Sequence, residues 1–531
     1  MSSAARSLLE EKESSPATYI AAFVSGLVLP FAFPGRDLFF LAWFCLVPFI
    51  IYLTECPRQI AFKAGLIFGI PFFFGTQYWI YYSINHYGNL NLVLSILIIL
   101  LLCLYESLYI GLFGVLLNYI TKRSPFPLVL TAPVIWVCLE YARGIIITGF
   151  PWSFIGYSQY KLLPLIQISD LTGIYGISFL IVAVNSIMAD FVLLAKRRRR
   201  IPLYPTVPTY LGASLLLIVF ICTLSYGYYR LKESDEGKTL KVAVIQGNIE
   251  QDKKWDKQYQ NSVFTTYLTL TKQVAVEKPD LIVWPETAVP FIFGTDTEFT
   301  ERLTGFQKEN KIPLVFGSIL VKSVEDRKYR LSNGAVLLDR NGNVIYSYDK
   351  IHLVPFGEYI PLRSILFFVD RLVEGIGTYI PGDKYGSANT SIGKFPVVIC
   401  YELIFPSLVR NFFLNGGDFL ITITNDAWFG NTIGPVQHFY TGVFRAIENR
   451  KPVIRAANTG ISGYIDSKGR IISKSSLFKR ETMNEEIVKN NKITFYTKYG
   501  DIFVYICLLT IAVIIINQMF HSRSRFGGKR W

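Results

Sequence analysis

Long uncharged apolar runs fill residues 1–230 and return at 502–519, and they limit the folds open to this chain. Hydrophobic residues make up 51% of the chain and charged residues only 17%, which is more apolar than an ordinary water-soluble protein. A helix needs about 20 apolar residues to cross a bilayer, and the sequence offers eight such candidates. The predicted spans are 17–34, 37–54, 62–83, 90–120, 126–143, 164–195, 207–229 and 502–519.

The positions of lysine and arginine predict how these spans are oriented. Basic clusters follow the second, fourth, sixth and eighth predicted spans, so all four fall on one side if eight spans alternate. They are Arg58 with Lys63, Lys122 with Arg123, KRRRR at 196–200 and the tail at 521–531. Basic loops mark the cytoplasmic side of a membrane protein. We therefore interpret the net charge of +14 as a topology signal and exclude nucleic acid as a partner.

Three parts follow from this pattern. Residues 1–230 are predicted to form a bundle of seven transmembrane helices. Residues 231–500 have the mixed composition of a water-soluble domain, large enough to bury its own core, and are placed outside the cytoplasm. Residues 501–531 are expected to form the eighth span and a basic cytoplasmic tail.

The soluble part alternates between strand-like and helix-like patterns, which is typical of an α/β domain. Two of the strand pairs are close enough to be hairpins, so a mixed sheet is expected. The predicted strands are 240–246, 281–284, 313–319, 334–338, 343–348, 395–400, 419–424 and 453–457, and the predicted helices are 256–277, 298–310, 402–414 and 435–450.

Cys400, in VVICYELIFP, is the only cysteine of the soluble part. That part can form no internal disulfide, and the absence of clustered His and Cys residues argues against a structural metal. An unpaired thiol facing an oxidising compartment is open to oxidation, so its presence favours a reactive role. The alternative is that Cys400 is a small buried hydrophobic residue.

Three chemically useful side chains follow three predicted strands: Glu286 after LIVW, Lys350 after NVIYSYD and Cys400 after FPVVI. Active sites of α/β proteins commonly form at such strand ends. A helix N-terminus and an ammonium both favour the thiolate, a carboxylate can carry the proton, and the lysine can stabilise an oxyanion. A Cys–His pair is the rival arrangement, but neither His352 nor His438 shows a third group in the sequence.

The motifs VWPETAVP (283–290), YDKIHLVPFGEYIP (348–361) and VVICYE (397–402) resemble those of the nitrilase superfamily. Over nearly its full length the chain is similar to the bacterial apolipoprotein N-acyltransferase family. Further motifs of that family are TNDAWFG (424–430), GPVQH (434–438), RAIENRKPVIRAANTGISGYID (445–466) and, in the membrane half, GFPWSFIGYSQ (149–159). The resemblance implies a transmembrane bundle joined to an α-β-β-α sandwich.

The resemblance also implies a two-step acyl transfer in the bacterial inner membrane, with the catalytic domain on the periplasmic side. Cys400 would take the sn-1 acyl chain of a phospholipid, usually phosphatidylethanolamine, as a thioester. The acceptor would be the α-amino group of the diacylglyceryl-cysteine of an apolipoprotein. Glu286 would be the general base and Lys350 the oxyanion stabiliser. The resemblance implies neither cofactor nor metal, because the phospholipid ester supplies an activated acyl group.

Four further residues match positions that the family uses to support its site: Trp255, Glu358, Tyr401 and Glu402. Each has a simpler interpretation where the residues alone are considered. Trp255 could be an interfacial aromatic anchor, and Glu402 a first-turn carboxylate that satisfies a helix dipole.

Other segments leave alternatives open. The apolar stretch 354–383 is a candidate lid that dips into the bilayer surface, or else a core helix. Glu140 and Arg143, in the fifth predicted span, are expected to pair, with no role assigned. The rival functions are a membrane-tethered nitrilase-type amidohydrolase, for which eight spans are more than a tether needs, and a transporter or sensor with a degenerate outer domain.

Overall fold

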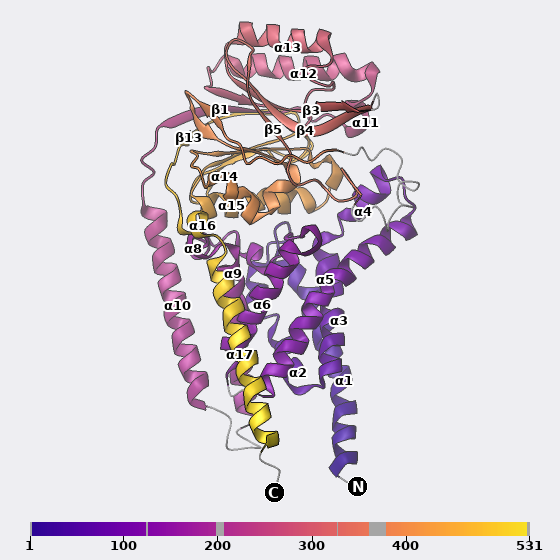
Figure 1. The fold of residues 1–531 in the computed structure, drawn as a ribbon, viewed down its shortest axis with the longest axis vertical. Coiled ribbons are helices and arrows are strands. Elements are labelled where there is room, and N and C mark those ends of the chain that lie inside the picture. Colours follow the sequence, from indigo (N-terminus) through magenta and orange to yellow (C-terminus); the bar gives the residue numbers. More distant parts are fainter. Residues whose placement is uncertain (1–2, 124–125, 198–205, 326–327, 361–378, 528–531) are drawn as a thin grey trace. The chain divides into compact units, whose positions relative to one another are not determined.

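The computed structural model of the protein describes residues 3–123, 126–197, 206–325, 328–360 and 379–527. The chain forms two compact units. A helical unit comprises Met1–Tyr81, Asn91–Leu231 and Asp501–Trp531, and an α/β unit comprises Tyr82–Leu90 and Lys232–Gly500. Figure 1 shows the helices and strands of each unit.

Six described helices of the chain are long and apolar enough to cross a membrane. They are α3 (Arg58–Gln77), α5 (Leu92–Thr121), α6 (Leu128–Ile145), α9 (Ile174–Arg197), α10 (Thr206–Lys232) and α17 (Ile502–Gly527). Two shorter apolar stretches, Pro16–Ala32 and Phe39–Glu55, include parts of α1 (Ser3–Val28) and α2 (Val47–Glu55). They coincide with the first two predicted spans, so the count of eight stays a prediction.

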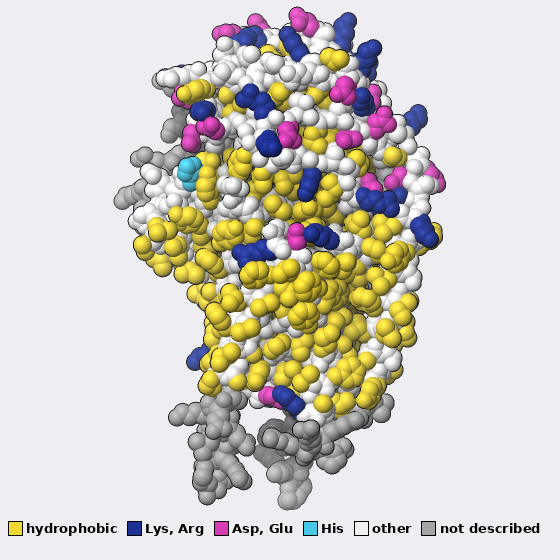
Figure 2. All heavy atoms as spheres, turned by 180° about the vertical axis from the view of Figure 1, so that it is seen from behind, with side chains coloured by type: hydrophobic (Ala, Val, Ile, Leu, Met, Phe, Trp, Pro, Cys, Tyr) yellow, Lys and Arg dark blue, Asp and Glu magenta, His cyan; other side chains and the backbone are white. Residues whose placement is uncertain are grey.

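The helical unit exposes large apolar side chains, and hydrophobic atoms cover its surface broadly (Figure 2). Leu101, Leu217 and Leu509 are each at least 60% exposed. A water-soluble protein does not present so wide an apolar surface, whereas hydrocarbon solvates it. This unit therefore belongs in a membrane.

The predicted span 164–195 is not one continuous helix, and the long helix in this region starts later than the sequence suggested. Leu163–Ile166 (α7) and Ser169–Thr172 (α8) are separate short helices, and α9 begins only at Ile174. The break falls at Gly173, whose φ of +64° is a left-handed conformation that glycine adopts without steric cost.

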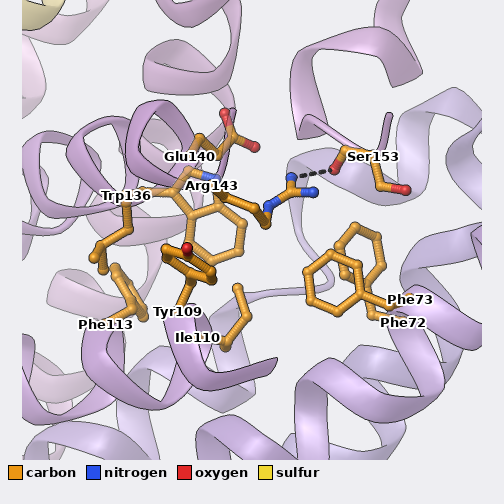
Figure 3. Close-up of a pocket in the computed structure, with 10 residues that line it drawn as sticks. Phe72, Phe73, Tyr109, Ile110, Phe113, Trp136, Glu140, Arg143 and Ser153 are labelled. Atoms are coloured by element: carbon orange, nitrogen blue, oxygen red, sulfur yellow. Dashed lines mark hydrogen bonds between the residues drawn. The ribbon is translucent and has the colours of Figure 1, made fainter. Parts of the chain in front are cut away.

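The helical unit buries a polar cluster around Arg143. Arg143 Nη1 donates to Glu106 Oε1 on α5 at 2.8 Å, and Nη2 donates to the carbonyl of Ser153 at 3.1 Å. Glu140 instead accepts the backbone N–H of Ile155. The predicted Glu140–Arg143 pair is therefore wrong, because Arg143 extends towards Ser153 and away from the Glu140 carboxylate (Figure 3).

The α/β unit contains two large mixed β-sheets. The first has six strands in the order β13-β1-β2-β3-β4-β5, and the second has five in the order β12-β11-β10-β9-β8. Four strand pairs are parallel (β1/β2, β2/β3, β8/β9 and β9/β10), and the remaining pairs of the two sheets are antiparallel. The strands are β1 (Thr239–Gln246), β2 (Leu281–Val283), β3 (Leu314–Glu325), β4 (Lys328–Leu338), β5 (Val344–Asp349), β8 (Val397–Ile399), β9 (Leu420–Thr424), β10 (Val453–Ala457), β11 (Gly463–Ile465), β12 (Ile471–Lys474) and β13 (Glu481–Val488).

Helices cover the outer face of each sheet (Figure 1). They are α12 (Lys257–Ala275) and α13 (Thr297–Asn310) over the first sheet, and α14 (Pro406–Phe413) and α15 (Gly434–Asn449) over the second. The inner faces meet where β1 contacts β10 and β4 contacts β8. The four layers confirm the predicted α-β-β-α sandwich. The contact between β4 of the first sheet and β8 of the second joins two chain segments that are far apart in the sequence.

The Arg143–Glu106 pair predicts a specific pattern of stability. Arg143→Met leaves the fully buried Glu106 carboxylate without its cation, which costs about 3–5 kcal/mol. We expect a lower thermal unfolding midpoint in detergent micelles for this variant. The double variant Arg143→Met/Glu106→Leu removes both charges and should recover most of the loss. A double variant with an unfolding midpoint as low as that of Arg143→Met would show that the stability loss does not come from the unpaired Glu106 carboxylate.

Candidate active site

The three strand-end residues lie inside the α/β unit. Glu286 follows β2, Lys350 follows β5 and Cys400 follows β8. Their exposed fractions are 6%, 1% and 6% respectively. A carboxylate, an ammonium and a thiol are therefore all removed from bulk water, where electrostatic interactions are strong.

Lys350 is held between two carboxylates. Its Nζ lies 2.9 Å from Glu358 Oε2 and 3.8 Å from Glu286 Oε1. Asn333 on β4 ties the same carboxylates together, because its Nδ2 donates to Oε1 of each at 2.8 Å. Burial alone would lower the pKa of Lys350, but the charges of Glu358 and Glu286 outweigh it and keep the pKa above its usual range. Lys350 is thus a fixed cation.

Glu286 is positioned from both sheets. Its Oε1 accepts from Asn333 in the first sheet, and its Oε2 accepts the backbone N–H of Asn425, which follows β9 in the second, at 2.8 Å. Because each carboxylate oxygen has a fixed donor, the side chain has one orientation.

Cys400 is a neutral thiol at rest. Burial raises its pKa well above the usual range, the charge of Glu286 raises it further, and Lys350 opposes both. The expected help from a helix N-terminus is small, because Cys400 begins only a 3-10 turn, Cys400–Ile404. The sulfur therefore needs a base when it attacks, and Glu286 is the carboxylate whose charge acts on it most strongly.

Glu402 joins the segment after Lys350 to the strand before Cys400. Its Oε1 accepts from Tyr348 Oη at 2.6 Å and from the backbone N–H of Ile351 at 2.7 Å, and its Oε2 accepts the N–H of Ile399 at 2.7 Å. Burial raises the pKa of Glu402 to about 6. Glu402 lies in the first turn of Cys400–Ile404, where a carboxylate can satisfy a helix dipole. Its hydrogen bonds, however, mainly fix two strand ends to each other.

The other two predicted supporting residues lie differently. The Tyr401 ring packs against His352 and Phe405, with centroid distances of 5.6 and 5.0 Å. Trp255 ends the short helix α11 (Gln251–Lys254) and is 44% exposed. The structure thus brings Glu286, Lys350, Glu358 and Asn333 into direct contact, while Trp255 lies on the surface.

Lys254 is a charged residue that the sequence did not single out. In DKKW it resembles a solvated surface lysine, yet it is 1% exposed. Its Nζ donates to the backbone carbonyl of Glu286 at 2.9 Å and also to Thr287 Oγ1. Burial lowers its pKa to about 8, against the charges of Glu286 and Cys400. Lys254 holds the turn after Glu286, where Thr287 has a φ of +43°.

His438 does have a third group, contrary to the sequence interpretation. Its Nδ1 lies 3.0 Å from Asp426 Oδ1, and Asp426 binds Arg455. However, its Nε2 faces the backbone carbonyl of Cys400 at 3.1 Å rather than the sulfur. This geometry gives no support to the Cys–His alternative.

Most of the predicted lid, residues 361–378, lies outside the described residues. The chain on either side is fixed near the site, because Gly382 N donates to Lys350 O and Val354 N to Glu358 Oε2, both at 2.8 Å. Among the residues that the structure describes, no cluster of three or more His, Cys, Asp or Glu side chains could hold a metal ion.

Comparison with known proteins assigns the family. Residues 25–187 match the apolipoprotein N-acyltransferase N-terminal domain, and residues 241–491 match the carbon-nitrogen hydrolase domain. The apolipoprotein N-acyltransferase of Geobacter metallireducens is 39% identical over 93% of this chain and 94% of its own. The chain belongs to the apolipoprotein N-acyltransferase family. The enzyme of the same name from Haemophilus influenzae is 32% identical over 94% of each chain.

This membership confirms the predicted enzyme class, an acyltransferase within the carbon-nitrogen hydrolase superfamily, and its association with a membrane. Among solved structures, Saccharomyces cerevisiae Nit3, a member of branch 10 of the nitrilase superfamily, is 20% identical. It covers 48% of this chain and 92% of its own, with a TM-score of 0.38. The carbon-nitrogen hydrolase of Helicobacter pylori is 17% identical over 47% of this chain and 89% of its own, with a TM-score of 0.37.

The raised pKa of Cys400 can be measured by alkylation with iodoacetamide, which reacts with the thiolate. We expect the rate at Cys400, followed by peptide mass spectrometry, to keep rising up to about pH 10, whereas the rate of an ordinary thiol is half-maximal near about pH 8.5 and levels off towards about pH 10. The same cysteine in the urea-unfolded chain is the matched control and should level off. A plateau below about pH 8 in the folded protein would mean that Cys400 is a resting thiolate.

Proposed function

We propose that this protein moves the sn-1 acyl chain of a phospholipid to the α-amino group of a diacylglyceryl-cysteine at an apolipoprotein N-terminus. The observation that carries the proposal is the buried group of Glu286, Lys350 and Cys400 within a chain of this family. A nucleophile, a proton carrier and a fixed cation are what a two-step acyl transfer needs.

In the first step Cys400 becomes acylated. Glu286 takes the thiol proton while Sγ attacks the ester carbonyl, and the oxyanion of the tetrahedral intermediate forms beside Lys350. The intermediate collapses by breaking the bond to the glycerol oxygen, which receives the proton from Glu286. The products are a thioester on Cys400 and a lysophospholipid.

In the second step the α-amino group attacks the thioester carbonyl. Glu286 accepts a proton from the amine, Lys350 again balances the oxyanion, and the carbon–sulfur bond breaks. The sulfur takes the proton back from Glu286, so Cys400 returns to its neutral thiol with an amide formed on the acceptor. The high thiol pKa suits this cycle, because it favours a proton on the free sulfur after each turnover.

Glu358 and Asn333 serve the same reaction by holding Lys350 and Glu286 in one arrangement. A second carboxylate on the lysine also keeps its charge in place when Glu286 becomes protonated during each step. Glu402 fixes the two strand ends. Trp255 and Tyr401 are the aromatic residues that we assign to the substrate-contacting edge of the site.

The membrane supplies the donor, which we propose to be phosphatidylethanolamine. The distribution of basic residues supports an inner-membrane protein with its helical part at 1–230, its catalytic part at 231–500 on the periplasmic side, and a last span and cytoplasmic tail at 501–531. An apolar bundle that is more than a tether suits a substrate that arrives laterally from lipid.

The proposal is tested with phosphatidylethanolamine that carries an isotope-labelled sn-1 chain. We expect the purified protein to gain the mass of one labelled chain on the Cys400 peptide, and hydroxylamine to remove it as it does a thioester. Addition of a synthetic diacylglyceryl-cysteine peptide should move the label to the peptide α-amino group. Cys400→Ala should gain no label.

Glu286→Gln, which preserves the shape of the side chain but cannot carry the proton, should slow acylation by about 10²–10⁴-fold. Two results would contradict the proposal. One is label that never reaches Cys400. The other is label released as free fatty acid at the same rate with and without the peptide, which would favour a hydrolase.

A further inference from the structure

A fully buried polar cluster lies behind the nucleophile, and the proposed reaction does not use it. Its members are Thr424 at the end of β9, Asp426, His438 on α15 and Arg455 on β10, and none of them is exposed. The cluster reaches the nucleophile through His438, whose Nε2 lies 3.1 Å from the carbonyl oxygen of Cys400. Thr424 Oγ1 donates to Asp426 Oδ1 at 2.9 Å.

The contacts determine which nitrogen of His438 carries a hydrogen. A backbone carbonyl only accepts hydrogen bonds, so Nε2 must be the donor to Cys400. On the other side of the ring, Arg455 Nη2, which can only donate, lies 3.0 Å from Nδ1. Nδ1 also lies 3.0 Å from Asp426 Oδ1, which can only accept, so Nδ1 faces both a donor and an acceptor, and the contacts fix a hydrogen on Nε2 alone.

The electrostatics of the cluster determine the charges that surround this ring. Burial and the charge of Arg455 both lower the pKa of His438. Burial would raise the pKa of Asp426, but Arg455 outweighs it and holds that pKa at about 2. Asp426 and Arg455 therefore form a buried ion pair beside the ring, and the charge of Asp426 also contributes to the raised pKa of Cys400.

Cys400 needs such a restraint because of its backbone conformation. Its φ is +53°, a left-handed conformation that costs a non-glycine residue about 1–3 kcal/mol and persists only where the surroundings enforce it. The peptide unit is planar, so a hydrogen bond to the Cys400 carbonyl fixes the orientation of the whole peptide group between residues 400 and 401.

We propose that His438 is a positioning residue that holds the carbonyl of Cys400 through its Nε2–H, with Arg455 and Asp426 fixing the plane of its ring. The proposal rests on the role of Cys400 as the nucleophile. It gives His438 an effect on the rate of acylation that a histidine serving only to fill the core would not have.

Two substitutions separate the two ring nitrogens. His438→Gln places its amide nitrogen near the position of Nε2 and can still donate to the Cys400 carbonyl. His438→Asn places its amide near Nδ1, where it can bind Asp426 or Arg455, but it is too short to reach Cys400. Both variants lose the ring, so they are matched for the loss of core packing.

The measurement is single-turnover acylation of Cys400 by labelled phosphatidylethanolamine, per folded molecule, together with the KM for the lipid. We expect His438→Asn to acylate about 100-fold more slowly with an unchanged KM, and His438→Gln to stay within about tenfold of the wild type. Equal rates in the two variants would overturn the positioning role. A wild type that forms no acyl-enzyme would overturn the proposed function and this role with it.

If neither variant folds, the protonation of the His438 ring can be measured by nitrogen-15 NMR on the unmutated protein. The chain has four histidines, so nitrogen-15 labelling of histidine gives few signals, which can be assigned by removing the other three one at a time. We expect the Nε2 of His438 to carry a hydrogen. A neutral ring protonated only at Nδ1 would refute the proposal.

Discussion

The ammonium of Lys350, buried between the carboxylates of Glu286 and Glu358, is the interaction on which the site depends. One buried cation among two carboxylates would be costly without hydrogen bonds to the remaining oxygens. Asn333, Asn425 and the backbone N–H of Val354 supply them. The result is a rigid, almost dry arrangement in which charges are fixed before substrate binds, which is the condition for electrostatic stabilisation of an oxyanion.

The site depends on the packing of the two sheets, because its residues come from both of them. Asn333 lies in the first sheet and Lys350 follows its strand β5, whereas Cys400 and Asn425 follow strands of the second. Glu402 bonds to the chain on both sides of that boundary. Each sheet alone would present only part of the chemistry, so the packing of the inner faces determines the distances within the site. Substitutions at this interface should therefore affect activity as well as stability.

The sequence was sufficient to predict the α/β layers and the three strand ends, because apolar runs and the polar residues that end them are local patterns. It did not show Asn333, Lys254 or the partners of His438. Asn333 lies 47 residues from Glu286, and a surface-like DKKW gives no sign that Lys254 is buried. The Glu140–Arg143 pairing failed for the same reason. Helical spacing allowed it, but α5 supplied Glu106 from a distant part of the chain.

A double-mutant cycle of acylation rates tests most directly whether these residues act as one unit. Glu286→Gln removes the proton carrier, and Glu358→Gln loosens Lys350. If the two carboxylates act through the same lysine, the double variant should be little slower than Glu286→Gln alone, because a misplaced Lys350 matters less once the base is lost. Free-energy losses that simply add in the double variant would contradict the account, since they would mean that Glu286 and Glu358 act independently.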